Sequence, residues 1–450
     1  MEIARRSFLA GSGLALAAAG SAAAQAPPTA APPPPAQPAA PPAPAPATAP
    51  QPVDWRRIRA QFALTPDWID MSAMLIASHP TAVRDAIDRH RRQLDANPVI
   101  YLEANNRSLQ NRARAAAGQY LGAPAEAVAL TDSTTMGVGL VYNGLRLRYG
   151  QEILTTDQDY YVTHESLRLA ALRTGAKVRK IPLYEDIRSV SEGALVARLT
   201  SQITPQTRVL ALTWVHSSTG LKLPIPAIAA ALVPINASRS EHDRVLLCVD
   251  GVHGFGNQDV SFAGLGCDFL IAGCHKWIFG PRGTGVIYGS EAGWRAALPT
   301  IPTFLDSDAY SHWISGSDPG LANAVRMTPG GFKAFEHLWA LSEAFWLHQN
   351  IGRGEVARRT AELATQLKAG LAAMPHVTLV TPMSPQLSAG IVSFDVAGMS
   401  AHQVVSRLRD WKIIASVAPY ARQHVRLTPS IRNFPHEIDF VLQAVRAMAA

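Results

Sequence analysis

Lys276 stands in a setting that favours nucleophilic chemistry. Its neighbours in the chain include Gly273, Cys274, Trp277 and Phe279, so small and apolar groups surround it. Poor solvation lowers the pKa of a lysine and frees its amine to attack a carbonyl carbon. A lone buried lysine more often forms an ordinary ion pair, so Lys276 indicates a site only if neighbouring motifs support it.

Two motifs and a turn give that support. An Asp-Gly-Val-His motif at 250–253 follows the apolar run 245–249, and Lys276 lies in a Cys-His-Lys-Trp motif. A Gly-Pro-Arg-Gly-Thr-Gly turn follows at 280–285. Together they resemble the motifs of the class V branch of the fold-type-I pyridoxal phosphate (PLP) enzymes. The residues in the two motifs are similar to those of the isopenicillin N epimerase-like members. The resemblance covers residues 60–445, nearly the whole body of the chain.

The resemblance implies PLP as the cofactor, and the residue types agree with it. PLP works as an electron sink only while its pyridine nitrogen is protonated, which requires a carboxylate partner such as Asp250. Lys276 would form a Schiff base with the cofactor, and His253 would hydrogen-bond its phenolic oxygen. An aspartate and a lysine at this spacing, followed by the glycine-rich turn, predict a PLP site rather than an ion pair. Lys276, Asp250 and His253 are therefore the predicted catalytic residues.

The phosphate group of such a cofactor needs a cradle of its own. Ser133, Thr134 and Thr135 stand where a helix is expected to begin, and free N–H groups and hydroxyls there attract a dianion. A plain helix cap has the same residue types. In chain order the two threonines match the family's phosphate turn, so both are predicted to bind the phosphate. The resemblance also implies a contact from His275 and, because family members are homodimers, a hydroxyl lent across the interface by Thr328.

Two further segments offer cofactor contacts. A flat side chain usually stacks on the cofactor ring, and Tyr160 is the candidate, with Tyr161 as the alternative and a core aromatic residue as the ordinary interpretation. Ser217 follows another strand end, where family members contact the phenolic oxygen. Trp214 and His216 depart from the family pattern in this segment. Ser217 is still predicted to bind the cofactor, but the pattern does not assign a specific contact to Ser217 or to His216.

An amino-acid substrate also needs a partner for its carboxylate. An arginine can bind a carboxylate with two parallel hydrogen bonds. Arg426 lies in a segment that resembles the family's C-terminal arginine motif and is the predicted substrate-binding residue. Arg422 and Arg432 are close enough in sequence to be alternatives, and a surface arginine is the ordinary interpretation.

Alternating helices and buried strands must position these residues. Apolar runs predict strands at 153–155, 209–214, 245–249, 269–272 and 286–288, and helical periodicity predicts helices at 83–94, 106–120, 135–149, 336–350 and 355–374. Continuous apolarity means that both faces of the sheet are covered, as in a parallel sheet of an α/β protein. Ligands of such sheets bind beyond the carboxyl ends of the strands, here after Trp214, Val249 and Ala272.

The expected fold is therefore α/β. The resemblance implies the fold-type-I PLP-dependent transferase fold, with a mostly parallel seven-stranded sheet between helices. Strands near 377–380 and 391–394 and a last helix from Pro435 predict a smaller C-terminal α+β unit. The predicted division is an N-terminal segment at 53–80, a large PLP-binding domain at 81–320 and a small domain at 321–450.

The first 52 residues are predicted to be a targeting signal followed by a linker. Residues 1–24 contain Arg5-Arg6-Ser7-Phe8-Leu9, a twin-arginine signal, followed by a short apolar stretch and an Ala-x-Ala cleavage site. An uncleaved anchor is the alternative. Residues 25–52 are almost only Pro and Ala, which favours an extended, disordered linker. The sequence thus predicts handling by the twin-arginine export machinery, a periplasmic location and no stable membrane span after cleavage.

Composition narrows the function further. The net charge of +7 is not clustered, so no nucleic-acid partner is expected, and the histidines show no metal-ligand spacing. A cysteine desulfurase needs a nucleophilic cysteine upstream of the arginine, and residues 413–423 contain none. The resemblance implies an epimerase-like enzyme that acts at the α-amino group or α-carbon of an amino acid or small peptide. An aminotransferase, a carbon–sulfur lyase and a non-catalytic envelope binding protein of the same fold remain alternatives.

Overall fold

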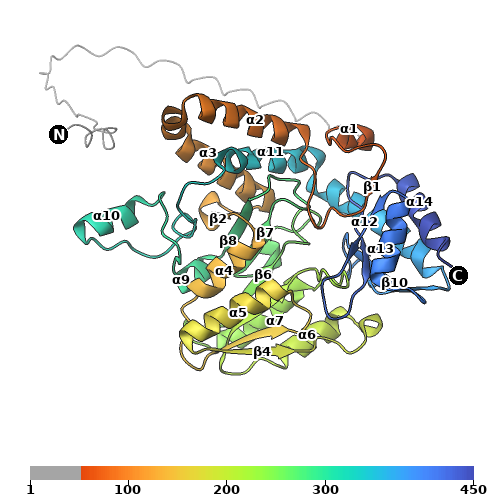
Figure 1. The fold of residues 1–450 in the computed structure, drawn as a ribbon. Helices are drawn as coiled ribbons and strands as arrows, with labels where there is room; N and C mark the ends of the chain where they lie inside the picture. Colours follow the sequence, from red (N-terminus) through yellow and green to blue (C-terminus); the bar gives the residue numbers. More distant parts are fainter. Residues whose placement is uncertain (1–51, 450) are drawn as a thin grey trace, which may run out of the picture. The chain divides into compact units, whose positions relative to one another are not determined.

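The computed structural model describes residues 52–449 (Figure 1). The predicted twin-arginine signal at 1–24 and the linker up to residue 51 lie outside the described residues. Among residues 52–449, no helix is both long and apolar enough to cross a membrane.

A seven-stranded sheet forms the centre of the described part. Its order is β2-β8-β7-β6-β5-β3-β4, and only β8 runs antiparallel to its neighbours. The strands are β2 (Val128–Thr131), β3 (Glu152–Thr156), β4 (Lys177–Ile181), β5 (Thr207–Thr213), β6 (Leu246–Asp250), β7 (Phe269–Gly273) and β8 (Gly285–Gly289). Five of them were predicted. The sequence missed the two edge strands, because β2 is only four residues long and β4 carries three charged residues, as exposed edges often do.

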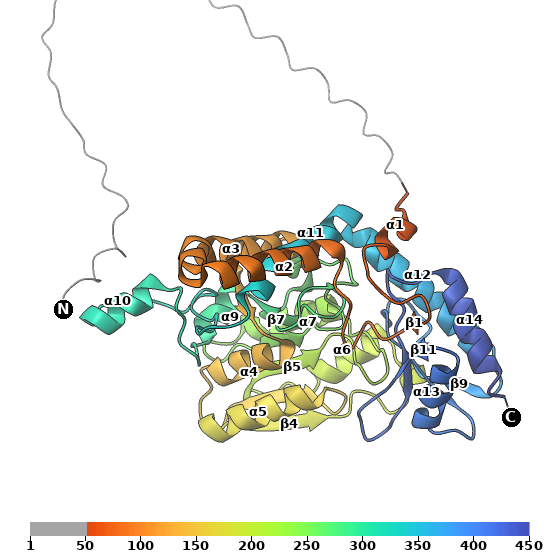
Figure 2. The same cartoon turned by 45° about the horizontal axis from the view of Figure 1, so that its top comes forward.

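Helices cover both faces of the sheet, and successive strand residues point to opposite cores. Leu246 and Cys248 pack with α4 (Thr134–Gly144) and α5 (Tyr161–Thr174). Leu247 and Val249 belong to the larger core on the other face. That core includes α3 (Pro98–Leu121), α6 (Glu192–Thr200), α7 (Ile225–Ala237) and α11 (Phe335–Ile351), with α2 (Thr81–Ala96) packed on α3 and α11 (Figure 2). This double coverage explains the continuous apolar runs.

Helix α4 is shorter than predicted. The sequence pattern extended to Tyr149, but the helix ends at Gly144, and Leu145 turns into an extended conformation. Leu145 forms an isolated bridge with Ala297. A side chain at Gly144 would lie 2.3 Å from the carbonyl oxygen of Leu298, so glycine permits this close crossing of two chain segments. Tertiary contact therefore ends a helix that local periodicity would continue.

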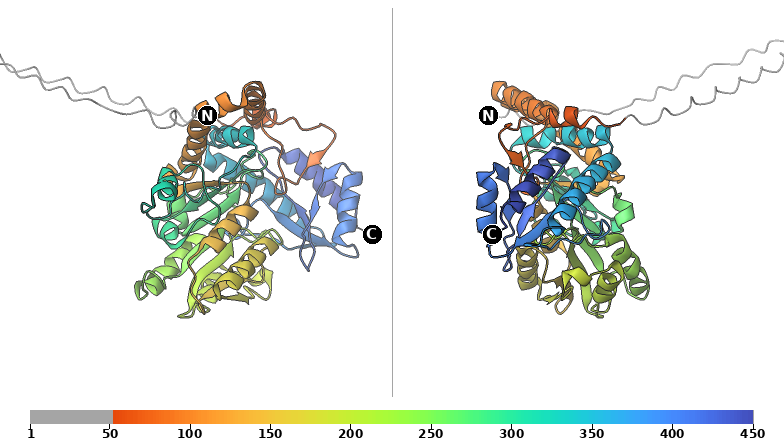
Figure 3. Two further views of the ribbon diagram at one scale, coloured as in Figure 1. Left: turned by 60° about the vertical axis from the view of Figure 1, so that its left-hand side comes forward. Right: turned by 90° about the vertical axis from the view of Figure 1, so that its right-hand side faces the viewer.

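The C-terminal part forms a second layered unit (Figure 3). Its antiparallel sheet has the order β12-β13-β10-β9 and packs against three helices around a core of its own. These elements are β9 (Val377–Leu379), β10 (Val392–Val396), β12 (Ser416–Val417), β13 (Val425–Leu427), α12 (Arg353–Ala372), α13 (Ala401–Asp410) and α14 (Pro435–Arg446). β9, β10 and α14 match the predicted strands and last helix. The division at residue 320 stays a prediction.

Short elements connect these layers. The strand β1 (Ile69–Asp70) pairs in parallel with β11 (Ile413–Ile414), which joins the N-terminal segment to the C-terminal part. Within residues 52–449, the remaining α-helices are α1 (Trp55–Arg59), α8 (Phe262–Leu265), α9 (Glu291–Ala296) and α10 (Ser307–Ser315), and two short 3-10 helices are η1 (Ala125–Ala127) and η2 (Ile187–Ser189).

Candidate active site

The predicted site residues gather around one cavity of about 170 Å³. It lies where β5, β6 and β7 end, because these parallel strands bring their carboxyl ends to the same edge of the sheet. Nine of the ten predicted residues line it: Thr134, Thr135, Tyr160, Ser217, Asp250, His253, His275, Lys276 and Arg426. The C-terminal unit contributes Arg426, so the cavity combines residues from both sheets.

Asp250 and Lys276 are the central ionisable pair. Asp250 is the last residue of β6, and its Oδ1 accepts a hydrogen bond from Val252 N at 3.1 Å. Burial raises the pKa of Asp250 to about 6, against the attraction of Lys276. Burial also lowers the pKa of Lys276 to about 8, while Asp250 pulls it upward. The lysine that the sequence predicted to be poorly solvated is therefore close to losing its proton at neutral pH.

His253 is held as a neutral donor. Burial, with Lys276 as a further cause, lowers the pKa of His253 well below its ordinary value. Its Nδ1 lies 3.3 Å from Trp277 Nε1, and an indole nitrogen can only donate. The proton of the neutral ring therefore sits on Nε2, which leaves that atom as a donor. His253 can thus bind an anionic oxygen, as the predicted contact to a phenolic oxygen requires.

A cradle for a phosphate lies at the start of α4. Ser133 caps the helix and accepts from Met136 N, while Thr134 Oγ1 accepts from Gly273 N at 2.7 Å. The first N–H groups of a helix have no partner within it and attract anions. A side chain at Gly273 would lie 3.0 Å from both His275 and Thr134, so glycine lets these two approach the cavity. Burial lowers the pKa of His275 to about 4, which leaves it neutral at pH 7.

Tyr160 lines the cavity, whereas Tyr161 is 67% exposed and does not line it. The adjacent Asp159 is 2% exposed, and its carboxylate accepts from Thr156 N at 2.9 Å and from Thr213 N at 2.6 Å. These bonds join the ends of β3 and β5 directly before Tyr160. The structure therefore favours Tyr160, the predicted candidate, over the alternative Tyr161.

Arg426 lines the cavity and keeps hydrogen-bond donors for a ligand. Its Nε donates to Ser416 Oγ, Nη1 to the Ser217 carbonyl and Nη2 to the Val417 carbonyl, at 3.2, 2.9 and 2.9 Å. A guanidinium has five N–H donors, so two remain for a ligand. The side chain is 2% exposed, and burial lowers its pKa to about 10, which keeps it charged at neutral pH.

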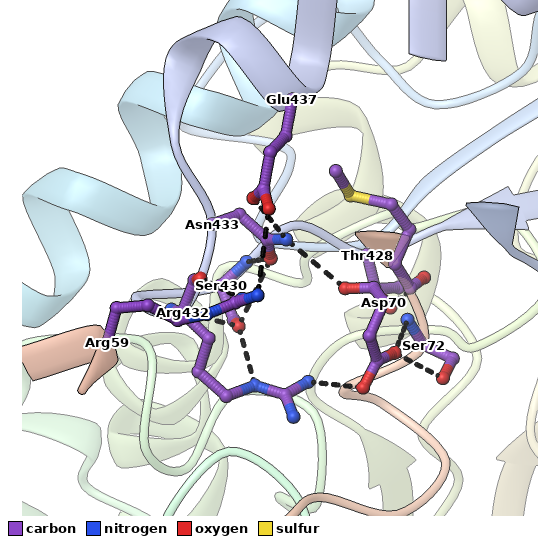
Figure 4. A network of polar contacts seen from close by, with 9 residues as sticks. Arg59, Asp70, Ser72, Thr428, Ser430, Arg432, Asn433 and Glu437 are labelled. Atoms are coloured by element: carbon purple, nitrogen blue, oxygen red, sulfur yellow. Dashed lines mark hydrogen bonds and ion pairs between the residues drawn. The ribbon is translucent and has the colours of Figure 1, made fainter. Parts of the chain in front are cut away.

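The two alternative arginines lie elsewhere. The Arg422 side chain is 80% exposed and pairs with Asp395 at 3.7 Å. Arg432 is fully buried in a separate polar network, shown in Figure 4, where it pairs with Asp70 at 3.1 Å. In the same network Asn433 donates to the Asp70 carbonyl and to Glu437 (Figure 4). This network ties the N-terminal segment to α14, so Arg432 has a structural partner already.

Thr328 and His216 lie away from the cavity lining. Thr328 is 1% exposed, and its hydroxyl accepts from Leu130 N and donates to the Ala324 carbonyl. Such a side chain has no free surface to lend to a partner subunit, so its packing argues against the predicted role of Thr328. His216 is fully buried outside the lining, whereas its neighbour Ser217 does line the cavity.

Some residues at the cavity were not found from the sequence. Met74 and Leu75 come from the N-terminal segment, about 200 positions before Lys276, and nothing in their types distinguishes them from core residues. Tyr420 stands beside the cavity, where its hydroxyl lies 2.7 Å from Ser217 Oγ. It falls within the stretch 413–423, whose only informative feature in the sequence was the lack of a cysteine.

The comparisons with known proteins agree with this geometry. The family model described as aminotransferase class-V matches residues 71–420. This chain belongs to the aminotransferase class-V family. It is a PLP-dependent enzyme of that family, as the sequence predicted.

Among its relatives in this family are two isopenicillin N epimerases. That of Streptomyces clavuligerus is 27% identical over 88% of this chain and 98% of its own length, and that of Amycolatopsis lactamdurans is 28% identical over 79% and 89%. A probable cysteine desulfurase of Vibrio cholerae is 24% identical over 86% of this chain and 96% of its own length.

Solved structures show the fold. A mutant of C-DES with glycine covalently linked to its PLP cofactor matches 86% of this chain and 98% of its own, with a TM-score of 0.77 and 23% identity. The structure of the cystine C–S lyase C-DES with its product cysteine persulfide matches with a TM-score of 0.75 and 24% identity. The match covers 85% of this chain and 98% of that chain. These likenesses confirm the predicted fold type I arrangement.

The residues present fit PLP. The α4 start with Thr134, Thr135 and His275 suits the phosphate, and Lys276 offers an amine for the aldehyde carbon. Asp250 suits the pyridine nitrogen, and a carboxylate whose own pKa is raised can share a proton there. The cavity therefore provides one partner for each polar group of the cofactor.

Attachment of the cofactor should depend on pH through Lys276. Only the free amine reacts, so the rate at which cofactor-free protein binds PLP covalently should rise with pH, with a midpoint near 8, because burial has lowered the lysine pKa. Asp250 stabilises the ammonium form, so Asp250→Asn should move the midpoint to lower pH. Stopped-flow absorbance measures both. A wild-type midpoint near the ordinary lysine value of 10.5 would contradict the buried setting of Lys276.

Replacing Arg426 with lysine should raise KM far more than it lowers cofactor content. Lysine keeps the charge but loses the paired N–H donors, and a charge-assisted contact of about 1.5 to 3 kcal/mol corresponds to roughly ten- to a hundredfold in affinity. KM should be compared for the amino acid and its decarboxylated amine. Arg422→Lys is the matched control, since the Arg422 side chain is 80% exposed and outside the cavity. An unchanged preference for the acid in Arg426→Lys would remove the clamp role.

Proposed function

We propose that this enzyme acts at the α-carbon of an amino acid or small peptide and inverts its configuration, as an epimerase. The observation that carries the proposal is the placement of Lys276, Asp250 and Arg426 around a single cavity. Two isopenicillin N epimerases among the curated relatives support the choice of reaction.

The chain's own side chains divide the work as follows. When bound, PLP supplies a sink for the electron pair left on the α-carbon after proton loss. Arg426 binds the substrate carboxylate with its two remaining N–H donors and so fixes the orientation of the α-carbon. Lys276 Nζ, with a pKa near 8, takes the α-proton, and inversion requires that a proton be returned to the opposite face of the α-carbon. Asp250 keeps a proton on the pyridine nitrogen.

A cysteine nucleophile receives no support from this site. All three cysteines, Cys248, Cys267 and Cys274, are buried, and burial raises the pKa of each thiol. The loop that follows β12 places Tyr420 next to the cavity and has no cysteine. Desulfuration through a cysteine on this loop therefore disagrees with the geometry. Transamination and carbon–sulfur cleavage without such a nucleophile are the competing outcomes.

One assay panel separates these outcomes. The holoenzyme is incubated with amino acids and short peptides, and each mixture is assayed for inverted stereochemistry, keto acid and released sulfide. The proposal expects inversion without stoichiometric keto acid or sulfide. Keto acid as the main product would assign the enzyme to transamination, and sulfide would assign it to carbon–sulfur cleavage. A protein that binds PLP but changes no substrate would be the non-catalytic alternative.

We further propose that the enzyme is exported to the periplasm through the twin-arginine pathway and works as a homodimer. The motif Arg5-Arg6 and the family resemblance support these two points. Cell fractionation of the Arg5→Lys/Arg6→Lys variant tests export. The two lysines should keep the protein in the cytoplasm, and recovery of the variant from the periplasm would refute twin-arginine export.

Light scattering tests the homodimer, and a measured mass near 48.2 kDa would refute the homodimer.

A further inference from the structure

A second and larger cavity adjoins the active site. Its volume is about 510 Å³, against about 170 Å³ for the first. Three chain segments supply consecutive or nearly consecutive residues to the two cavities. Ser217 and Pro419 line the first, while Ser218 and Tyr420 line the second. Residues 157–158 likewise line the second cavity just before Tyr160 reaches the first. Only a thin wall therefore separates them.

Tyr420 forms the closed part of that wall. Its hydroxyl lies 2.7 Å from Ser217 Oγ, and its ring centroid lies 5.7 Å from that of Tyr160. Burial raises the pKa of Tyr420 far above its ordinary value, so the phenol stays neutral and keeps this hydrogen bond at any physiological pH. Ser217 is fixed in turn, because its carbonyl accepts from Arg426. Tyr420 is thus linked through Ser217 to Arg426, the proposed substrate-binding residue.

The substrate can approach this wall with only one of its groups. Its amino group must face the cofactor, its carboxylate must face Arg426, and its α-proton must face Lys276. The side chain is the remaining substituent. The space left for it inside the cavity is small, because the whole cavity of about 170 Å³ must also hold the cofactor ring and is below the usual range of roughly 300–1,000 Å³ for small-molecule sites.

We propose that Tyr420 determines substrate specificity by closing the active site against the second cavity, so that the wild-type enzyme prefers α-amino acids with short side chains. The second cavity is a latent side-chain subsite. Its lining combines charged side chains of both signs with neutral polar and apolar ones: Asp157, Glu185, Asp186, Arg188, Arg422, Gln158, Ser218, Thr219, Leu379 and Val380. This inference rests on the proposed function and adds the substrate class to it.

The wall should be openable at moderate cost. A neutral hydrogen bond contributes about two- to tenfold to an equilibrium constant. Loss of the hydroxyl alone, in Tyr420→Phe, should therefore weaken the discrimination by that factor. Loss of the ring, in Tyr420→Ala, should join the two cavities and remove most of the discrimination between short and long side chains.

The test compares L-alanine with L-glutamine, which differ in side-chain length but are both uncharged. Loss of the α-hydrogen signal in D2O reports the step common to inversion, transamination and elimination, and titration of the cofactor's visible spectrum reports binding. Wild type should show a higher kcat/KM for alanine. Tyr420→Ala should raise kcat/KM for glutamine by about tenfold or more, mainly through KM, with cofactor content unchanged and the alanine value within about threefold.

Tyr184→Ala is the matched control. Tyr184 lines the second cavity but not the wall, so this variant enlarges the subsite without opening it and should leave the alanine-to-glutamine ratio unchanged. A wild-type preference for glutamine, or an unchanged ratio in both Tyr420→Ala and Tyr420→Phe with alanine still processed, would overturn the specificity role alone. Absence of binding and of exchange for both amino acids in every variant, together with no inversion of any amino acid or short peptide in the assay panel, would overturn the proposed function as well.

Discussion

Lys276→Ala is expected to lower the rate of α-hydrogen exchange by at least about a thousandfold, since a positioned general base alone contributes roughly 10² to 10⁴. The variant loses the proton carrier and the amine that holds the cofactor. Lys276 lines the cavity just beyond the end of β7, with a pKa lowered to about 8 by burial. Exchange of a substrate α-hydrogen in D2O measures the effect.

Two companions separate chemistry from folding. Lys276→Arg keeps a cation but has no reactive amine, so it should be nearly as inactive as the alanine variant. Lys222→Ala removes another lysine whose pKa burial lowers, but its Nζ is already bonded to Gln258 and the Pro385 carbonyl. It should retain exchange activity at the level of its folded fraction. Substantial exchange in Lys276→Arg would show that Lys276 acts only through charge.

Asp250→Asn is expected to keep PLP bound and to lower turnover by orders of magnitude. An amide has no negative charge to hold a proton on the pyridine nitrogen, so the electron sink is lost while the phosphate contacts persist. Asp250 is 3% exposed at the end of β6, directly beside the cavity. Cofactor content and the exchange rate are measured on the same preparation.

Asp268→Asn supplies the matched control. Asp268 is also a buried aspartate, but it lies at the opposite end of the sheet, where it accepts from Leu247 N and Ser290 Oγ. This variant should lose thermal stability without a specific loss of exchange rate per folded molecule. If Asp250→Asn and Asp268→Asn lose equal, small fractions of activity, Asp250 has no special role toward the cofactor.

The sequence predicted the fold where local pattern and tertiary structure agree. The run 245–249 is apolar at every position because one core claims Leu246 and Cys248 and the other claims Leu247 and Val249. Edge strand β4 was not predicted because its neighbour on one side is solvent, so charged side chains are tolerated along it. The predicted end of α4 was wrong because a crossing segment, not the helix's own residues, sets it.

The site shows the same division. Asp250 and Lys276 could be predicted because the ends of adjacent parallel strands meet whatever the loops do. Among the three arginines, only the family resemblance favoured Arg426, because the sequence does not show that Arg422 is exposed and that Arg432 pairs with Asp70. Tyr420 shows the limit most clearly: its partner Ser217 is 203 positions away, and only the folded chain brings them together.

The most direct test of the account is to locate the cofactor on the wild-type protein. The yellow holoenzyme is reduced with borohydride, digested, and searched by mass spectrometry for peptides that carry the added cofactor mass. The account predicts the added mass on the peptide that contains Lys276, and on Lys276 itself after fragmentation. Attachment to any other lysine, or no retained cofactor mass on a protein that binds PLP, would contradict it.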